Sequence, residues 1–175
     1  MNRMKPPVIS IVSKKRSGKT TLLERIIPEL KQRGYRVGTV KHDTHGFEID
    51  HEGKDTWRHK QAGAEVVVIS SPWKISVIKD VAEEVGLEEI VASQLSEMDI
   101  VLTEGFKRSG MPQVEVFLST AHQHPMHDRT NPGTLVAVMS DVPLDLGVPR
   151  FHIDDIPALA DFIETLFIRP ASNGL

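Results

Sequence analysis

A short polar loop near the N-terminus carries the residues best suited to bind phosphate. It follows an apolar run at residues 8–12, precedes a helical pattern, and ends in Ser17-Gly18-Lys19-Thr20. Backbone N–H groups at a helix N-terminus, a lysine ammonium and a threonine hydroxyl are what a Mg²⁺-bound polyphosphate requires. The glycine expected five residues before Gly18 is Ser13, so the motif depends on its strand-loop-helix context. The alternative is a surface turn whose Ser or Thr caps the helix.

Residues in and around this loop are predicted to bind the nucleotide and its Mg²⁺. Lys19 neutralises the terminal phosphates and, with Glu104, is a catalytic candidate. Thr20 and Glu104 are the predicted Mg²⁺ ligands, because Glu104 ends a buried strand predicted at residues 99–103. The alternative for Glu104 is an ordinary acidic residue at a strand end. The predicted nucleotide-binding residues are Lys14, Lys15, Arg16, Ser17, Gly18, Lys19, Thr20, Thr21, Ser140 and Asp141.

Two parts of that set have a second interpretation. The basic run Lys14-Lys15-Arg16 suits phosphate contact and a solvated turn about equally. Asp141 follows a strand predicted at residues 135–139, and its carboxylate can accept hydrogen bonds from N1–H and the 2-amino group of guanine. Adenine does not present these two donors together. Asp141 also suits a turn before Val142-Pro143.

A second candidate region follows the strand predicted at residues 35–40. The loop from Asp43 to Lys54 is rich in histidine, carboxylates and glycine, and a loop of that length in a compact domain is usually functional or disordered. If the sheet is parallel, it lies beside the phosphate loop, where ligands bind in open α/β sheets. The predicted substrate-binding residues are Lys41, His42, Asp50, Lys54 and Asp55.

Strands and helices alternate along the chain, which predicts an α/β fold with a mostly parallel sheet and helices on both faces. Helical patterns lie at residues 22–30, 53–63, 88–96 and 156–167, and further strands at 113–118 and 150–153. Two β-branched runs, 66–70 and 74–79, predict a β-hairpin extension. Because no repeat or linker divides the chain, we expect one nucleotide-binding domain spanning residues 1–175.

The composition narrows the partners. With 21 Lys and Arg against 24 Asp and Glu, the net charge of −3 gives no reason to expect a nucleic-acid or membrane partner. The absence of cysteine excludes disulfides and thiolate zinc sites and fits a cytoplasmic protein. The histidines of loop 119–133 (His122, His124 and His127) and its Asp128 are interpreted as solvated and mobile, not as a metal site.

Several stretches, spread over nearly the whole chain, resemble those of the molybdopterin-guanine dinucleotide biosynthesis protein B (MobB) family. The resemblance depends on these stretches: Ser17-Gly18-Lys19-Thr20-Thr21-Leu22, Val40-Lys41-His42, Gly53-Lys54-Asp55-Thr56, Ala62-Gly63-Ala64, Thr103-Glu104-Gly105-Phe106-Lys107, Val138-Met139-Ser140-Asp141-Val142-Pro143-Leu144 and the Asp155-Ile156 helix. It implies a P-loop fold of the GTPase and ATPase group that works as dimers. It also implies GTP and Mg²⁺ as cofactors. The family commonly has a more glycine-rich loop than Ser13-Lys14-Lys15-Arg16.

The resemblance further implies an accessory role in attaching GMP to molybdopterin, with weak GTP hydrolysis at most. The nucleotidyl transfer would belong to a separate guanylyltransferase of the MobA type, and molybdopterin itself is a candidate ligand. The alternative function is a P-loop kinase acting on a small molecule held by the loop from His42 to Asp55. A kinase normally closes an arginine-bearing lid over the phosphates, and the candidates Arg108 and Arg129 do not lie in a clear lid helix. We therefore favour the accessory role.

Overall fold

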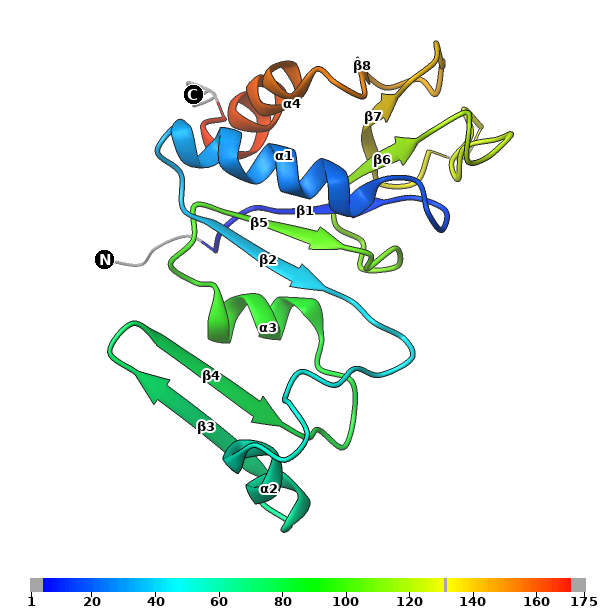
Figure 1. The fold of residues 1–175 in the computed structure, drawn as a ribbon. Helices are drawn as coiled ribbons and strands as arrows, with labels where there is room; N and C mark the ends of the chain where they lie inside the picture. The colour runs from blue at the N-terminus through cyan, green and yellow to red at the C-terminus, as the bar shows by residue number, and fades with distance from the viewer. Residues whose placement is uncertain (1–4, 131, 171–175) are drawn as a thin grey trace. The chain divides into compact units, whose positions relative to one another are not determined.

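The computed structural model describes residues 5–130 and 132–170. The described chain divides into two compact units, one formed by parts of Met1–His42 and Leu87–Leu175, the other by Asp43–Gly86 (Figure 1). The first unit contains the predicted phosphate loop, and the second contains the predicted hairpin.

The first unit is built on a six-stranded sheet in which every neighbouring pair is parallel. Its strands, in the order β2-β5-β1-β6-β7-β8, are β2 (Val37–Lys41), β5 (Ile100–Glu104), β1 (Val8–Val12), β6 (Gln113–Phe117), β7 (Leu135–Ser140) and β8 (Arg150–His152). From β1 the chain runs to the edge strand β2 and returns to β5, which lies next to β1. It then crosses to β6 on the other side of β1 and continues outward through β7 to β8. The loop after β1 therefore lies at the point where the strand order reverses, which is where open α/β sheets bind ligands.

Helices cover both faces of this sheet, as predicted. Helix α1 (Lys19–Gln32), helix α4 (Ile156–Ile163) and the π-helix η1 (Glu164–Ile168) lie on one face, and α3 (Leu87–Gln94) lies on the other (Figure 1). Side chains alternate between faces along a strand. In β5, Ile100 and Leu102 accordingly join the core under α1 and α4, whereas Val101 packs against α3.

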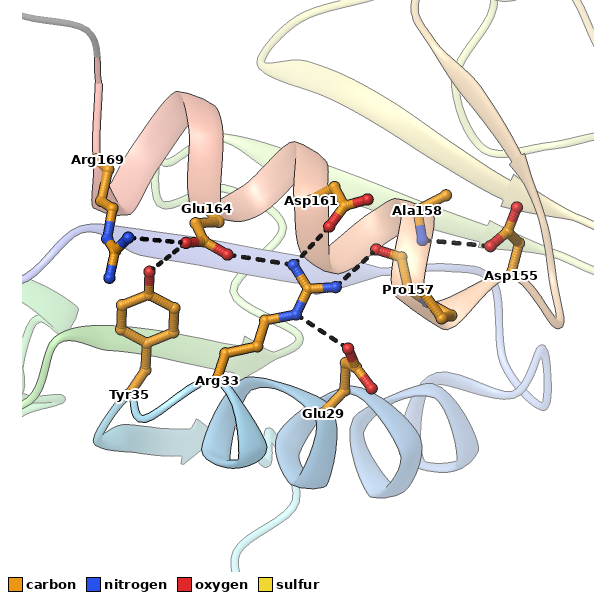
Figure 2. A network of polar contacts seen from close by, with 9 residues as sticks. All are labelled: Glu29, Arg33, Tyr35, Asp155, Pro157, Ala158, Asp161, Glu164 and Arg169. Atoms are coloured by element: carbon orange, nitrogen blue, oxygen red, sulfur yellow. Dashed lines mark hydrogen bonds and ion pairs between the residues drawn. The ribbon is translucent and has the colours of Figure 1, made fainter.

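A polar network joins the C-terminal end of α1 to α4 and η1 (Figure 2). The guanidinium of Arg33 donates to Glu29 (2.9 Å), Asp161 (2.6 Å) and Glu164 (3.1 Å). The hydroxyl of Tyr35 donates to the other oxygen of Glu164 (2.6 Å). These donors, Tyr35 first, hold the pKa of Glu164 below its usual range. The network lies at the opposite end of α1 from the phosphate loop, so its role is to fix the helix that carries the loop.

The second unit contains α2 (Asp55–Gln61) and the antiparallel pair β3 (Val66–Ser71) and β4 (Lys74–Lys79), which confirms the predicted hairpin. Directly paired residues share one face of an antiparallel ladder. On one face Val67 is buried at 6% exposure. The other face carries Val66, Val68, Ile75 and Val77, each between 46% and 68% exposed. The hairpin thus presents an uncovered apolar face.

Candidate functional site

The phosphate loop, residues 13–18, connects β1 to α1 through two left-handed residues. Arg16 has a φ of 61° and Gly18 a φ of 82°. The hydroxyls of Ser13 and Ser17 both donate to the carbonyl of Lys14, at 2.6 and 3.2 Å. The first intrahelical bond of α1 runs from Leu22 N–H to Gly18 O, so the amides just before Leu22 lie in the first turn, where helices attract anions.

Lys19 lies at the centre of a group of charged side chains. Its Nζ donates to Ser13 Oγ at 2.9 Å. Burial lowers the pKa of Lys19; the negative charge of Glu104 opposes this shift, and the positive charges of Lys107 and Lys41 reinforce it. An anion near Lys19 would therefore be favoured by three ammonium groups, and it would in turn favour the charged form of Lys19.

Thr20 and Glu104, the predicted Mg²⁺ ligands, lie in direct contact. Thr20 Oγ1 donates to the Glu104 carboxylate at 3.1 and 3.2 Å. Oxygen ligands of this kind suit Mg²⁺, which usually takes one or two protein ligands and completes its shell with phosphate and water. Among the described residues, no group of three or more His, Cys, Asp or Glu could hold a metal ion. With two oxygen ligands from the protein, the pair could hold Mg²⁺ when phosphate and water complete its shell.

The turn after Glu104 brings His42 to the same end of the sheet. Gly105 and Phe106 both have positive φ values, 97° and 52°. The His42 ring lies against the Phe106 ring with centroids 4.6 Å apart, and the His42 N–H donates to Glu104 O at 3.0 Å. In the parallel pair β2 and β5, Lys41 lies opposite Glu104. Two of the predicted substrate-binding residues, Lys41 and His42, therefore lie next to the predicted Mg²⁺ ligands.

The other three predicted substrate-binding residues belong to the second unit. Asp50 Oδ1 accepts a hydrogen bond from His51 N–H at 2.8 Å, and its Oδ2 is buried without a hydrogen-bond partner among the described residues. Lys54 precedes α2, and Asp55 is the first residue of that helix. An acidic residue in the first turn of a helix interacts favourably with the helix dipole and stabilises the helix. Asp55 therefore has a local structural role as well as its predicted role in substrate binding.

The region on the other side of the phosphate loop contains Asp141 and an apolar hollow. Asp141 accepts hydrogen bonds from the N–H and the hydroxyl of Ser119, at 2.8 and 2.9 Å. These bonds, the backbone one first, lower the pKa of Asp141. Ser140 is buried, and its hydroxyl bonds to the backbone of Val142. The hollow is lined by Gly18, Thr21, Leu22, Arg25, Leu118 and Ile153.

The loop after β6, which we interpreted as solvated and mobile, contacts the phosphate loop. Lys14 Nζ donates to His124 O at 2.8 Å, and His122 Nε2 lies 2.7 Å from Lys15 O. The end of this loop is tied to Glu115, a carboxylate with 1% side-chain exposure. The sequence signal for this anchor is a charged residue, Glu115, inside the largely apolar strand predicted at residues 113–118.

No helix in the part of the chain that the structure describes is long and apolar enough to cross a membrane. The central parallel sheet, with its phosphate loop at the order reversal and a Lys, Thr and Glu converging there, defines the class as a P-loop NTPase-like fold.

The family is shown by comparison with known proteins. The family model "Molybdopterin guanine dinucleotide synthesis protein B" matches residues 8–141. The chain is 34% identical over 160 residues to a molybdopterin-guanine dinucleotide biosynthesis adapter protein of Escherichia coli, covering 90% of this chain and 91% of that one. It is 36% identical over 165 residues to the protein of that name in Haemophilus influenzae, with coverages of 90% and 88%.

Solved structures give the same result. A crystal structure of molybdopterin-guanine biosynthesis protein B is similar with a TM-score of 0.70 at 34% identity, covering 91% of this chain and 98% of that one. The crystal structure of Bacillus subtilis MobB is similar with a TM-score of 0.68 at 28% identity, with coverages of 90% and 95%. The chain belongs to the MobB family, as the resemblance of its motifs predicted.

Proposed function

We propose that the chain is a GTP-binding accessory protein of molybdenum cofactor biosynthesis, which assists the attachment of GMP to molybdopterin. The observation that carries the proposal is the contact of Thr20 with Glu104 beside the Lys19 ammonium. The adapter names of the relatives support the pathway. Lys19 would neutralise the terminal phosphates, and Thr20 and Glu104 would hold Mg²⁺ between them and the nucleotide.

The base would lie on the other side of the phosphate loop, over the apolar hollow between Thr21 and Leu118. Ser119, next to Leu118, is bonded to Asp141, so this carboxylate lies near the rim of the hollow. Each oxygen of a carboxylate has two lone pairs, so Asp141 can accept the two guanine donors and still hold Ser119. The basic run from Lys14 to Arg16 would add electrostatic attraction for phosphate.

Hydrolysis would be slow, because Glu104, the carboxylate that would orient the attacking water, is also a proposed Mg²⁺ ligand and contacts Thr20. GTP hydrolysis would then reset the carrier, and the nucleotidyl transfer would be carried out by a MobA-type partner enzyme. Lys41 and His42 would face the pterin or the terminal phosphate. For the second unit we propose Asp50, Lys54 and Asp55 as substrate-binding residues. We further propose that both units form one nucleotide-binding domain, residues 1–175, and that the protein acts in the cytoplasm.

We propose that two copies associate through the exposed apolar face of the hairpin formed by Val66, Val68, Ile75 and Val77. An uncovered apolar sheet face is an association surface unless it is protected by charge. Val68→Lys with Val77→Lys should convert a dimer into a monomer, measured by sedimentation. A wild-type protein that sediments as a monomer would exclude the dimer.

The test of the function is calorimetric titration with GTP and with ATP in the presence of Mg²⁺. Lys19→Ala should abolish GTP binding, and Asp141→Ala should reduce the preference for GTP over ATP. Lys31→Ala, at the exposed far end of α1, is the matched control and should bind as wild type does. Rapid ATP turnover stimulated by a small metabolite, with no response to molybdopterin or the guanylyltransferase, would favour the kinase instead.

A further inference from the structure

Glu115 is a carboxylate placed inside an apolar strand. Its side chain is 1% exposed, and in the β1–β6 pair it lies opposite Val12, the last residue before the phosphate loop. Burying such a group is costly unless hydrogen bonds compensate. Its oxygens accept from the N–H of Met126, from the N–H of His127 (3.0 Å) and from His127 Nδ1 (2.8 Å). The carboxylate therefore fixes the end of the loop formed by residues 119–130.

The same loop is held at its start and meets the phosphate loop in its middle. Asp141 binds the N–H and hydroxyl of Ser119. His124 O accepts from Lys14 Nζ at 2.8 Å, and His122 Nε2 donates to Lys15 O at 2.7 Å. Only two residues separate His124 from His127, so the anchor at Glu115 controls where the contacts of His122 and His124 with the phosphate loop fall.

The phosphate loop needs such external contacts because its own sequence does not favour its conformation. Arg16 has a φ of 61°, and a non-glycine residue in that region costs roughly 1–2 kcal/mol. A strained backbone persists only where its surroundings determine it. Contacts at Lys14 and Lys15, the two residues before Arg16, supply that determination.

We propose that Glu115 and His127 are positioning residues for nucleotide binding. They hold the 119–130 loop against the phosphate loop and thereby fix the backbone whose amides receive the phosphates. The proposal rests on the proposed GTP binding, but the bracing of the phosphate loop can be measured without nucleotide.

The affinity test compares two variants that break the anchor with one that keeps its donor. Glu115→Gln and His127→Ala should weaken GTP binding about tenfold, the factor that corresponds to one lost hydrogen bond. His127→Asn keeps an N–H donor close to the position of Nδ1 and should bind within about twofold of wild type. The control is Arg129→Ala in the same loop, which loses an exposed ion pair to Asp145.

The bracing test uses trypsin, because Lys14, Lys15 and Arg16 are all cleavage sites. Without nucleotide, cleavage in this run should be faster in the Glu115→Gln and His127→Ala proteins than in wild type and the control. His122→Ala removes the contact with Lys15 O while leaving the buried carboxylate intact, so it should also accelerate cleavage. This variant tests the brace even if the two anchor variants fail to fold.

Equal GTP affinity and equal cleavage rates in all these proteins would overturn the positioning role. The same holds if His127→Asn binds as weakly as His127→Ala. If wild type binds no GTP while the anchor variants are cleaved faster, the proposed function fails and the brace remains.

Discussion

The hydrogen bond between Lys19 and Ser13 allows a quantitative prediction for the affinity of the site. Ser13 stands where phosphate loops normally have glycine, is 1% exposed, and accepts from Lys19 Nζ at 2.9 Å. A triphosphate bound at the proposed site would compete with this hydroxyl for the Lys19 ammonium. Ser13→Ala removes the competitor, so the variant should bind GTP more tightly than wild type does.

The size of the effect follows from the contacts of the serine. A buried hydrogen bond to a charged group contributes about 1.5–3 kcal/mol, and since Lys19 is only partly buried we take about 1 kcal/mol for its bond to Ser13. That corresponds to about fivefold tighter GTP binding. The variant also loses the 2.6 Å bond from Ser13 to Lys14 O. The free energy of unfolding should therefore fall by about 1–2 kcal/mol, and Tm by about 3–6 °C.

The assay is calorimetric titration with Mg²⁺ and GTP, together with thermal unfolding of the protein alone. Ser17→Ala is the matched control, because the Ser17 hydroxyl donates to the same Lys14 carbonyl without contacting Lys19. The control should lose stability with no gain in affinity. Weaker GTP binding by Ser13→Ala would refute the reasoning, since it would mean that Ser13 supports Lys19 in the bound state.

Three further predictions concern stability. Gly38→Ala should lower the free energy of unfolding by about 1–3 kcal/mol in denaturant titration, because its Cβ would come within 2.9 Å of Met98; Gly86→Ala meets nothing within 4 Å and should not. Arg33→Met should lower Tm, and by less in high salt than in low salt, because it removes partly screened ion pairs. The pKa of Asp141 is lowered from 3.8, so its carboxylate stabilises the fold above that pH. This contribution to the free energy of unfolding should disappear as the pH falls through the folded pKa. In acid titration of stability, an Asp141→Asn protein should lack that part of the transition.

The fold was predictable where a local pattern carries it. The β-branched runs from Val66 to Lys79 gave the hairpin, and alternation of apolar strands with amphipathic helices gave a parallel sheet covered on both faces. The order of the strands was not predictable, because the placement of β5 and β6 on either side of β1 depends on packing across the sheet. The π-helical end of the last helix, from Glu164, was likewise missed because it carries no distinct sequence period.

The candidate site likewise contains contacts that the sequence could predict and contacts that it could not. Carboxyl ends of neighbouring parallel strands meet at one edge, which is why Thr20, Glu104, Lys41 and His42 could be grouped from the sequence. The contacts of the 119–130 loop could not be grouped, since they use the carbonyls of His124 and Lys15, which every residue type possesses.

The phosphate loop therefore illustrates how a conformation can persist without the glycine that usually permits it. Glycine makes a left-handed residue inexpensive locally, whereas Arg16 at a φ of 61° requires contacts from elsewhere. Those contacts come from a loop fixed by Glu115 in the adjacent strand and by Asp141 at the end of β7. The geometry of the loop thus depends on two carboxylates far away in the sequence. A change at either carboxylate should reach the phosphates through the backbone, without any direct contact between that side chain and a phosphate group.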